Sequence, residues 1–292
     1  MKHSTAELEK IANNIREDII KMLVKAGSGH SAGSLGMADI FTALYFEIMN
    51  NDPNKPFWED RDRLILSNGH ICPVRYATMA QAGYFPRDWL WRLRKLGSPL
   101  QGHPERLKLD GVETTSGPLG SGLGQASGYA YAARMDEKRF RIFCICSDGE
   151  HQEGNHWEAV QFAGKYNLSN LTVIVDRNNI QIDGFTEDVM PLEPLEDRYK
   201  AFNWSVINVD GHNFEEIVEA VGKARATYEN PTVIIAHTIP GKGVDFMEND
   251  FKWHGTPPGV SDIPGEPSKE EQVKIALKEL RTLAGKIKSE HE

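Results

Sequence analysis

The chain has 292 residues, a length that fits one large α/β domain with appended segments. Its 42 acidic and 33 basic residues give a net charge of −9, and no basic run could neutralise a row of phosphates, which argues against nucleic-acid binding. No apolar stretch reaches roughly 18 residues and no hydrophobic leader is present, so we expect a cytoplasmic protein that binds no membrane. The cysteine count of three is odd, and Cys144 and Cys146 alternate along an expected strand, which indicates buried small hydrophobes.

The N-terminal segment has the apolar spacing of an amphipathic helix, with Ser4 and Glu7 placed as a capping box. Its apolar positions are Leu8, Ile11, Ile15, Ile19 and Leu23. The glycine-rich run 26–34 is expected to be irregular, and helical spacing resumes from Met37 to Ile48.

Five short apolar runs then follow, separated by helical segments. They are Arg63–Ser67, Phe140–Ser147, Leu171–Asp176, Trp204–Val209 and Thr232–Thr238. Most are apolar on both faces, which is typical of buried parallel strands with crossover helices. The sequence therefore predicts an α/β fold with a doubly wound, mostly parallel sheet flanked by helices.

We assign this domain to residues 1–260 and a connector with a C-terminal helix to residues 261–292. Four prolines and two glycines between Pro257 and Pro267 predict an extended connector. Ser268 to Lys288 is typical of a charged helix, with Ser268 and Glu271 as its capping box, and we expect it to be peripheral.

Polar residues follow two consecutive strands of this predicted sheet. Asp148-Gly149 ends one strand and Asn178 ends the next, thirty positions later, which is the length of one βαβ unit. If the strands are neighbours, about 4.8 Å apart, both side-chain oxygens point to one place. Two such oxygens and a backbone carbonyl leave open positions on Mg²⁺ for phosphate and water. A lone Asp-Gly would more often only cap a helix, and the pairing with Asn178 favours a metal site.

Ser147-Asp148-Gly149 followed by Asn178 resembles the GDG…N motif of thiamine-diphosphate enzymes. Five further segments are similar to those of the transketolase family, in the right order and over nearly the whole chain. They are GSGHSAGSLGMA (27–38), DRLILSNGH (62–70), QGHPE (101–105), ETTSGPLGSGLGQASG (113–128) and KWHGTPP (252–258). Two positions depart from the family pattern: Ser147 replaces the first glycine of GDG, and Ser31-Ala32 replaces a frequent Pro-Gly.

The resemblance implies a thiamine-diphosphate-binding fold and a set of site residues. The metal, Mg²⁺ or in its place Ca²⁺ or Mn²⁺, would be bound by Asp148, Asn178 and the carbonyl of Ile180. Thiamine diphosphate would contact His70, Gly117, Leu119, Gly149, Glu153 and Asn178. The catalytic residues lining the substrate channel would be His30, His70, His103 and His254.

The residues themselves support part of this assignment. A single histidine is more often an ordinary core or surface residue, and none of the four shows the paired spacing of a metal site. Three of them, however, follow glycine in polar, irregular stretches, where a ring nitrogen can face a ligand. A neutral imidazole can hydrogen-bond to sugar hydroxyls and exchange protons near neutral pH, as ketol transfer requires.

Gly120, Gly124 and Gly128 recur every four residues in a segment that otherwise has helical spacing, so one bare face should be closely packed. Ordinary helix packing and a role at the cofactor are equally good explanations. A dinucleotide-binding loop is disfavoured because no apolar strand precedes these glycines. Gly241-Lys242-Gly243 has neither the spacing nor the following Ser or Thr of a phosphate-binding P-loop.

In the family, a second domain binds the aminopyrimidine end of the cofactor, and nothing after Ser268 is large enough to form one. We therefore expect the diphosphate-binding subunit of a split transketolase, whose partner carries a pyrimidine-binding domain and the catalytic glutamate, most simply as α₂β₂. The expected reaction transfers a two-carbon ketol unit from a ketose phosphate to an aldose phosphate, as in the pentose phosphate pathway. The alternatives are a specialised transketolase-like or deoxyxylulose phosphate synthase-like subunit, or a non-catalytic cofactor-binding module.

Overall fold

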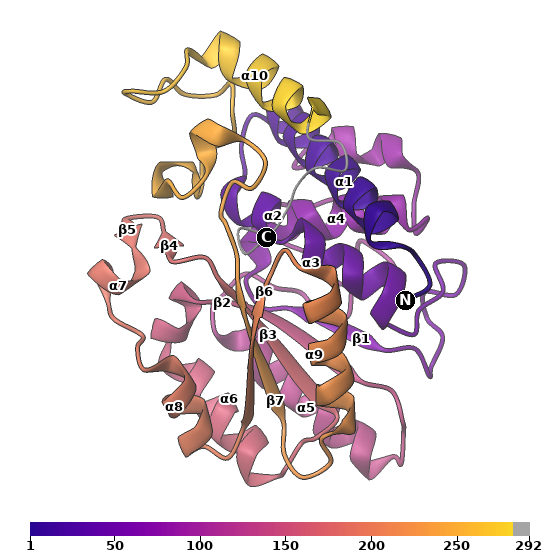
Figure 1. The fold of residues 1–292 in the computed structure, drawn as a ribbon. Coiled ribbons are helices and arrows are strands. Elements are labelled where there is room, and N and C mark those ends of the chain that lie inside the picture. The colour runs from indigo at the N-terminus through magenta and orange to yellow at the C-terminus, as the bar shows by residue number, and fades with distance from the viewer. Residues whose placement is uncertain (283–292) are drawn as a thin grey trace.

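The computed structural model describes residues 1–282, with a five-stranded parallel sheet at its centre (Figure 1). The strand order is β1-β2-β3-β7-β6, and every neighbouring pair is parallel. The strands are β1 (Arg63–Leu66), β2 (Ile142–Ser147), β3 (Leu171–Arg177), β6 (Ser205–Asp210) and β7 (Thr232–His237). All five predicted strands are therefore present, and the predicted doubly wound α/β fold is confirmed.

Helices connect the strands and cover both faces of the sheet. The α-helices are α1 (Thr5–Ala26), α2 (Ala32–Gly36), α3 (Ala38–Ala43), α4 (Cys72–Gln81), α5 (Ser121–Met135), α6 (Gly154–Lys165), α7 (Thr186–Val189), α8 (Leu195–Ala201), α9 (Phe214–Ala226) and α10 (Lys269–Thr282). A π-helical turn, η1 (Leu44–Ile48), continues α3. Short 3₁₀ turns are η2 (Gly69–Ile71), η3 (Arg87–Arg92), η4 (Gly149–Gln152), η5 (Asp245–Met247) and η6 (Phe251–Trp253). Within residues 1–282, no helix is both long and apolar enough to span a bilayer.

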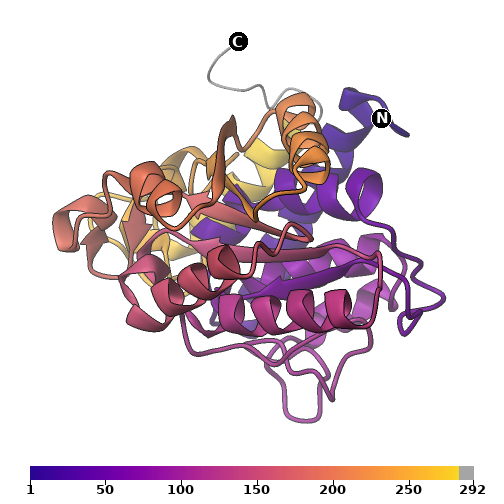
Figure 2. The same ribbon diagram turned by 90° about the horizontal axis from the view of Figure 1, so that it is seen from below.

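The sheet separates two hydrophobic cores because its central strands are apolar on both faces. Phe143 and Ile145 of β2 pack into the core beneath α1, α3 and α9, whereas Cys144 and Cys146 pack into the core beneath α5 and α6. Figure 2 shows the resulting three layers, with α5 and α6 on one side of the sheet and the indigo α1 and orange α9 on the other. Both cysteines are buried and free, as predicted.

The N-terminal region follows the sequence prediction except in its glycine-rich run. The predicted capping box of Ser4 and Glu7 is present, and Gly27 ends α1 in the left-handed conformation at φ 70°. The run 26–34 is not entirely irregular, however, because α2 begins at Ala32. A Cβ on Gly36 would lie 2.8 Å from the carbonyl oxygen of Ile239. Small residues are thus needed for this turn to pack against the segment after β7.

The C-terminal helix is not peripheral, contrary to the sequence expectation. Residues Ala276 and Leu280 of α10 are fully buried. The side-chain amide of Asn13 on α1 donates to the Leu280 carbonyl at 2.6 Å. Figure 1 shows the yellow α10 lying along the indigo α1. The rest of the predicted helix, beyond Thr282, lies outside the described residues.

A small hairpin follows β3 and was not predicted. Strands β4 (Ile180–Gln181) and β5 (Gly184–Phe185) pair in antiparallel register and lead into α7. Strands of two residues are too short to show a hydrophobic period, so the sequence pattern gave no signal for them. The hairpin lies beside the carboxyl ends of β2 and β3, the edge at which parallel sheets bind their ligands.

Candidate active site

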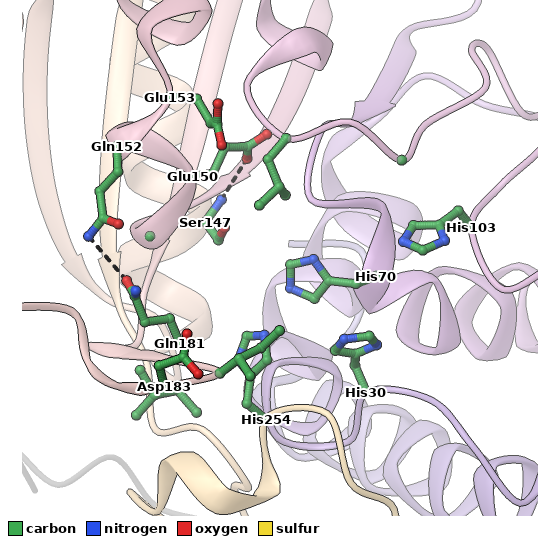
Figure 3. Close-up of a pocket in the computed structure, with 15 residues that line it drawn as sticks. His30, His70, His103, Ser147, Glu150, Gln152, Glu153, Gln181, Asp183 and His254 are labelled. Carbon is green, nitrogen blue, oxygen red and sulfur yellow. Dashed lines mark hydrogen bonds between the residues drawn. The ribbon is translucent and has the colours of Figure 1, made fainter. Parts of the chain in front are cut away.

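The carboxyl ends of β2 and β3 open onto a cavity of about 360 Å³ (Figure 3). It is lined by His30, His70, His103, Gly117, Leu119, Ser147, Gly149, Glu150, Gln152, Glu153, Ile180, Gln181, Ile182, Asp183 and His254. Nine of these residues were selected from the sequence as metal, cofactor or catalytic residues. Asp148 and Asn178 are not among the lining residues; they lie buried directly after the same two strands, 0% and 5% exposed. One site therefore brings together segments that are more than 200 positions apart in the chain.

The four histidines come from four different segments. His30 precedes α2, His70 lies in η2, His103 lies in the loop after η3, and His254 follows η6. The ring centroids of His30 and His70 are 4.9 Å apart, and that of His254 is 5.4 Å and 5.1 Å from those two rings. Figure 3 shows these three rings grouped at one side of the cavity, with His103 close by.

Ser31, one of the positions at which the chain departs from the family pattern, helps to position the histidines. The hydroxyl of Ser31 lies within hydrogen-bond distance of the carbonyls of Trp253 and Thr256, at 2.9 Å and 2.7 Å. Ser31 follows His30, and these carbonyls flank His254. The serine therefore joins the two segments that carry these histidines.

Burial keeps the histidine rings neutral. Desolvation, with His254 and Arg94 nearby, lowers the pKa of His30 to about 3. Desolvation lowers the pKa of His254 to about 4 and places the pKa of His70 well below its usual range. Among the described residues, Nδ1 of His30 and Nδ1 of His254 are buried without a hydrogen-bond partner. These nitrogens are available to a polar ligand in the cavity.

We expect the rings of His30 and His254 to stay uncharged between about pH 5 and pH 8. A folded-state pKa below the ordinary value means that protonation opposes folding, so these rings destabilise the protein only as the pH falls below the histidine's usual range. The ring-proton chemical shifts of both residues, followed by NMR, should not titrate in this window. The urea-unfolded chain is the control and should titrate near about 6.5. A midpoint near 6.5 in the folded protein would contradict the burial argument.

The opposite end of the site is built around the Asp148 carboxylate. One of its oxygens accepts from the backbone N–H of Gly149 at 2.7 Å, and the other accepts from the N–H of Asn179 at 2.7 Å and from Arg177 at 3.1 Å. Burial raises the pKa of Asp148 to about 6, and Arg177 offsets part of that rise. The carboxylate is thus held firmly at the end of β2.

Asn178 is oriented by Asp176, a residue that the sequence analysis did not select. The Asn178 amide donates to Asp176 at 2.8 Å, and its oxygen accepts from the N–H of Ile180 at 3.0 Å. Thr238 donates to the other Asp176 oxygen at 2.5 Å. Burial raises the pKa of Asp176 to about 7. The sequence signal that could have identified this residue is an aspartate near the end of an otherwise apolar strand.

These groups fit a hard divalent cation and a diphosphate. Within residues 1–282, no three His, Cys, Asp or Glu side chains are arranged to hold a metal ion. The described residues therefore contain no ligand set typical of zinc. A carboxylate, an amide and a carbonyl supply only oxygen ligands, as Mg²⁺ prefers. A Cβ on Gly117 would meet none of the described residues within 4 Å, and the cavity extends to this glycine. The backbone can therefore approach a ligand closely there.

Residues 8–270 match the family model for the transketolase thiamine diphosphate binding domain. The chain belongs to the transketolase family. The resemblance predicted from the sequence segments is thereby confirmed. So is the expectation of an enzyme, because the family consists of thiamine-diphosphate-dependent transferases.

Individual relatives agree with this family assignment. The chain is 42% identical over 254 residues to the 6-deoxy-6-sulfo-D-fructose transketolase subunit SqwG of Clostridium sp. (strain MSTE9), covering 87% of this chain and 92% of that protein. It is 36% identical over 291 residues to an apulose-4-phosphate transketolase subunit of Phocaeicola vulgatus, covering 100% and 99%. The crystal structure of transketolase from Campylobacter jejuni superposes with a TM-score of 0.84 at 32% identity, covering 97% of this chain and 48% of that chain. The chain thus spans about half the length of the solved transketolases it matches.

The glycine-rich face of this transketolase-family chain is only partly packed. A Cβ on Gly120 would lie 2.0 Å from the side-chain oxygen of Asn155, so close packing holds there. No described residue lies within 4 Å of a Cβ on Gly124 or Gly128, and both glycines are exposed on α5. Close packing at these two positions within this chain was therefore wrongly expected.

Proposed function

We propose that this chain is the diphosphate-binding subunit of a split transketolase. The observation that carries the proposal is the gathering of four histidines around one cavity at the carboxyl ends of β2 and β3, with Asp148 and Asn178 buried at those strand ends. Two relatives that the chain covers almost completely are named as transketolase subunits, which supports a partner subunit. That partner would carry the pyrimidine-binding domain and the catalytic glutamate, most simply in an α₂β₂ enzyme of the cytoplasm.

In this proposal the residues of the chain divide between two tasks. Asp148, Asn178 and the Ile180 carbonyl would hold the divalent metal, while Gly117, Leu119 and Gly149, which line the cavity, would contact the diphosphate. When bound, thiamine diphosphate supplies the electron sink that the cleavage of a ketose needs. The neutral histidines can donate to or accept from sugar hydroxyls, and the Nδ1 atoms of His30 and His254, which have no partner among the described residues, are available for such hydrogen bonds.

The expected reaction is transfer of a two-carbon ketol unit from a ketose phosphate to an aldose phosphate. The names of the relatives favour a specialised sugar over the pentose phosphate pathway, because one relative is named for a sulfonated fructose and another for apulose 4-phosphate. A specialised transketolase is therefore the second candidate, and it uses the same site with a different acceptor or donor.

An open face on α5 offers a place for the partner. The side chains Thr114 and Gln125 each have a buried oxygen without a hydrogen-bond partner in the described part of the chain. They line a groove that also includes Gly128. Exposed aromatic rings of Tyr131 and Phe162 lie on α5 and α6. Glycines, unpaired polar atoms and aromatic rings together suit a tightly packed subunit interface.

The test is an assay of the complex obtained by copurification with the tagged chain. With Mg²⁺ and thiamine diphosphate, we expect two-carbon transfer from at least one member of a panel of ketose phosphates, sulfonated ketoses and apulose 4-phosphate. The preferred donor then separates the general from the specialised transketolase. A complex that binds the cofactor but transfers no two-carbon unit across the panel would favour a non-catalytic module.

A further inference from the structure

We infer that Glu150 is a positioning residue that holds the cofactor-binding loop 117–120 against the carboxyl ends of β1 and β2. The inference rests on the proposed function, because Gly117 and Leu119 of this loop are the cofactor contacts proposed above. Glu150 lies in η4, directly after Gly149, and is 0% exposed. Nothing in the family resemblance pointed to it.

The Glu150 carboxylate joins three separate segments. Its Oε1 accepts from the backbone N–H of Gly120 at 2.6 Å and from the hydroxyl of Ser67, and its Oε2 accepts from the N–H of Ser147 at 3.1 Å. Figure 3 shows Glu150 reaching to Ser147 at the wall of the cavity. Ser67 follows β1, Ser147 ends β2 and Gly120 precedes α5. One side chain therefore fixes the relative positions of all three.

Ser67 extends this connection into α5. Its Oγ accepts from the N–H of Gly122 at 3.0 Å while its own proton is donated to Glu150. A Cβ on Gly122 would lie 2.4 Å from the Cβ of Ser67, so the first turn of α5 lies directly on the end of β1. A longer hydrogen bond, from the Asn155 amide to the Leu119 carbonyl at 3.3 Å, joins the loop before this turn to α6.

The chemistry at this position requires a carboxylate. All three partners are donors, and an ionised carboxylate accepts at both oxygens and donates at neither. Among residues 1–282 no cation forms a salt bridge with Glu150, although removing an unpaired carboxylate from water is costly. The three directed hydrogen bonds offset part of that cost, although burial still raises the pKa of Glu150 to about 7. An amide would turn an NH₂ group toward at least one of the N–H or O–H donors.

The test compares Glu150→Gln with a matched control, Asp18→Asn. Asp18 on α1 is also a fully buried carboxylate that accepts only, from Arg87 at 2.7 Å and from Gln81 at 3.2 Å. It shares no partner with Glu150. Ser67→Ala is a second, milder variant, which removes one donor to Glu150 and the acceptor of the Gly122 N–H.

Two readouts are needed, and the first requires no cofactor. In hydrogen exchange of the chain, Glu150→Gln should speed exchange of the Gly120 or the Ser147 amide, whichever faces the new NH₂ group, by about tenfold, and Ser67→Ala should do so for Gly122. In the copurified complex, calorimetry with Mg²⁺ should show thiamine diphosphate binding about tenfold more weakly to both variants. Asp18→Asn should lower thermal stability without either effect.

Wild-type exchange and wild-type cofactor affinity in Glu150→Gln would overturn the inference. Equal loss of affinity in Asp18→Asn would overturn it as well, because Glu150 would then act only through general stability. If Glu150→Gln does not fold, Ser67→Ala decides between these outcomes. If the wild-type complex does not bind thiamine diphosphate, the proposed function fails, while hydrogen exchange still reports whether Glu150 holds the loop.

Discussion

Asp148→Asn is expected to weaken Mg²⁺-dependent binding of thiamine diphosphate to the assembled enzyme by about 100-fold or more, since even supporting groups at metal sites are worth roughly 10- to 100-fold. The Asp148 carboxylate is the only charged group in the proposed ligand set, so its loss leaves the diphosphate charge poorly compensated. Asn178→Ala should have a smaller effect because it removes a neutral ligand. Calorimetric titration of the cofactor, with and without Mg²⁺, measures both.

Asp183→Asn is the matched control, because Asp183 lines the same cavity and is not a proposed ligand. Wild-type affinity is expected for this variant. Affinity of the wild-type enzyme should also fall as the pH drops through about 6, because the raised pKa of Asp148 means that a proton then competes with the metal. Unchanged Mg²⁺-dependent affinity in Asp148→Asn would contradict the assignment of Asp148 as a metal ligand.

The positions of the proposed metal ligands Asp148 and Asn178 at the carboxyl edge of the sheet could be predicted from the sequence because they follow from local rules. Asp148 and Asn178 each follow a short strand that is apolar on both faces, and such strands lie side by side in a parallel sheet. The register places Ser147 opposite Asp176, so the polar residues after both strands reach the same edge. Chain order alone was enough to bring them together.

Glu150 could not be located in this way. Its partners Gly120 and Ser67 are 30 and 83 positions away, and no spacing rule connects a buried carboxylate to donors on other loops. Contacts between distant segments also explain why α2 was expected to be irregular and α10 to be peripheral. Glycines between 26 and 36 disfavour a helix locally, yet tertiary contacts with the segment after β7 select one. The charged pattern of α10 concealed the buried side that packs on α1.

The isolated chain is expected to show no ketol transfer, even with saturating thiamine diphosphate and Mg²⁺. The cavity holds histidines and the proposed diphosphate contacts, and the family's glutamate for the aminopyrimidine would come from the partner. Adding the partner should restore activity and tighten cofactor binding together, because a ligand that binds only the assembled site is linked to assembly. The measurement is turnover of the chain alone and after titration with purified partner.

A substitution on the open face of α5 can test whether activity depends on the binding of the partner at this face. Gly128 is exposed, and a Cβ there would meet no described atom within 4 Å outside its own stretch of helix, so Gly128→Leu should leave the fold of the chain unaffected. If the partner packs on this face, the overpacked contact should weaken assembly by about 10- to 100-fold, and activity should fall with it.

Gly222→Leu on α9 is the matched control, because Gly222 is also an exposed helical glycine without a described neighbour within 4 Å of its Cβ and lies across the sheet. It should assemble and react as the wild type does. Substantial turnover by the chain alone, with partner excluded by mass spectrometry, would refute the split-enzyme proposal. If Gly128→Leu assembles normally with the partner, the split-enzyme proposal stands, but the partner binds at another surface of the chain.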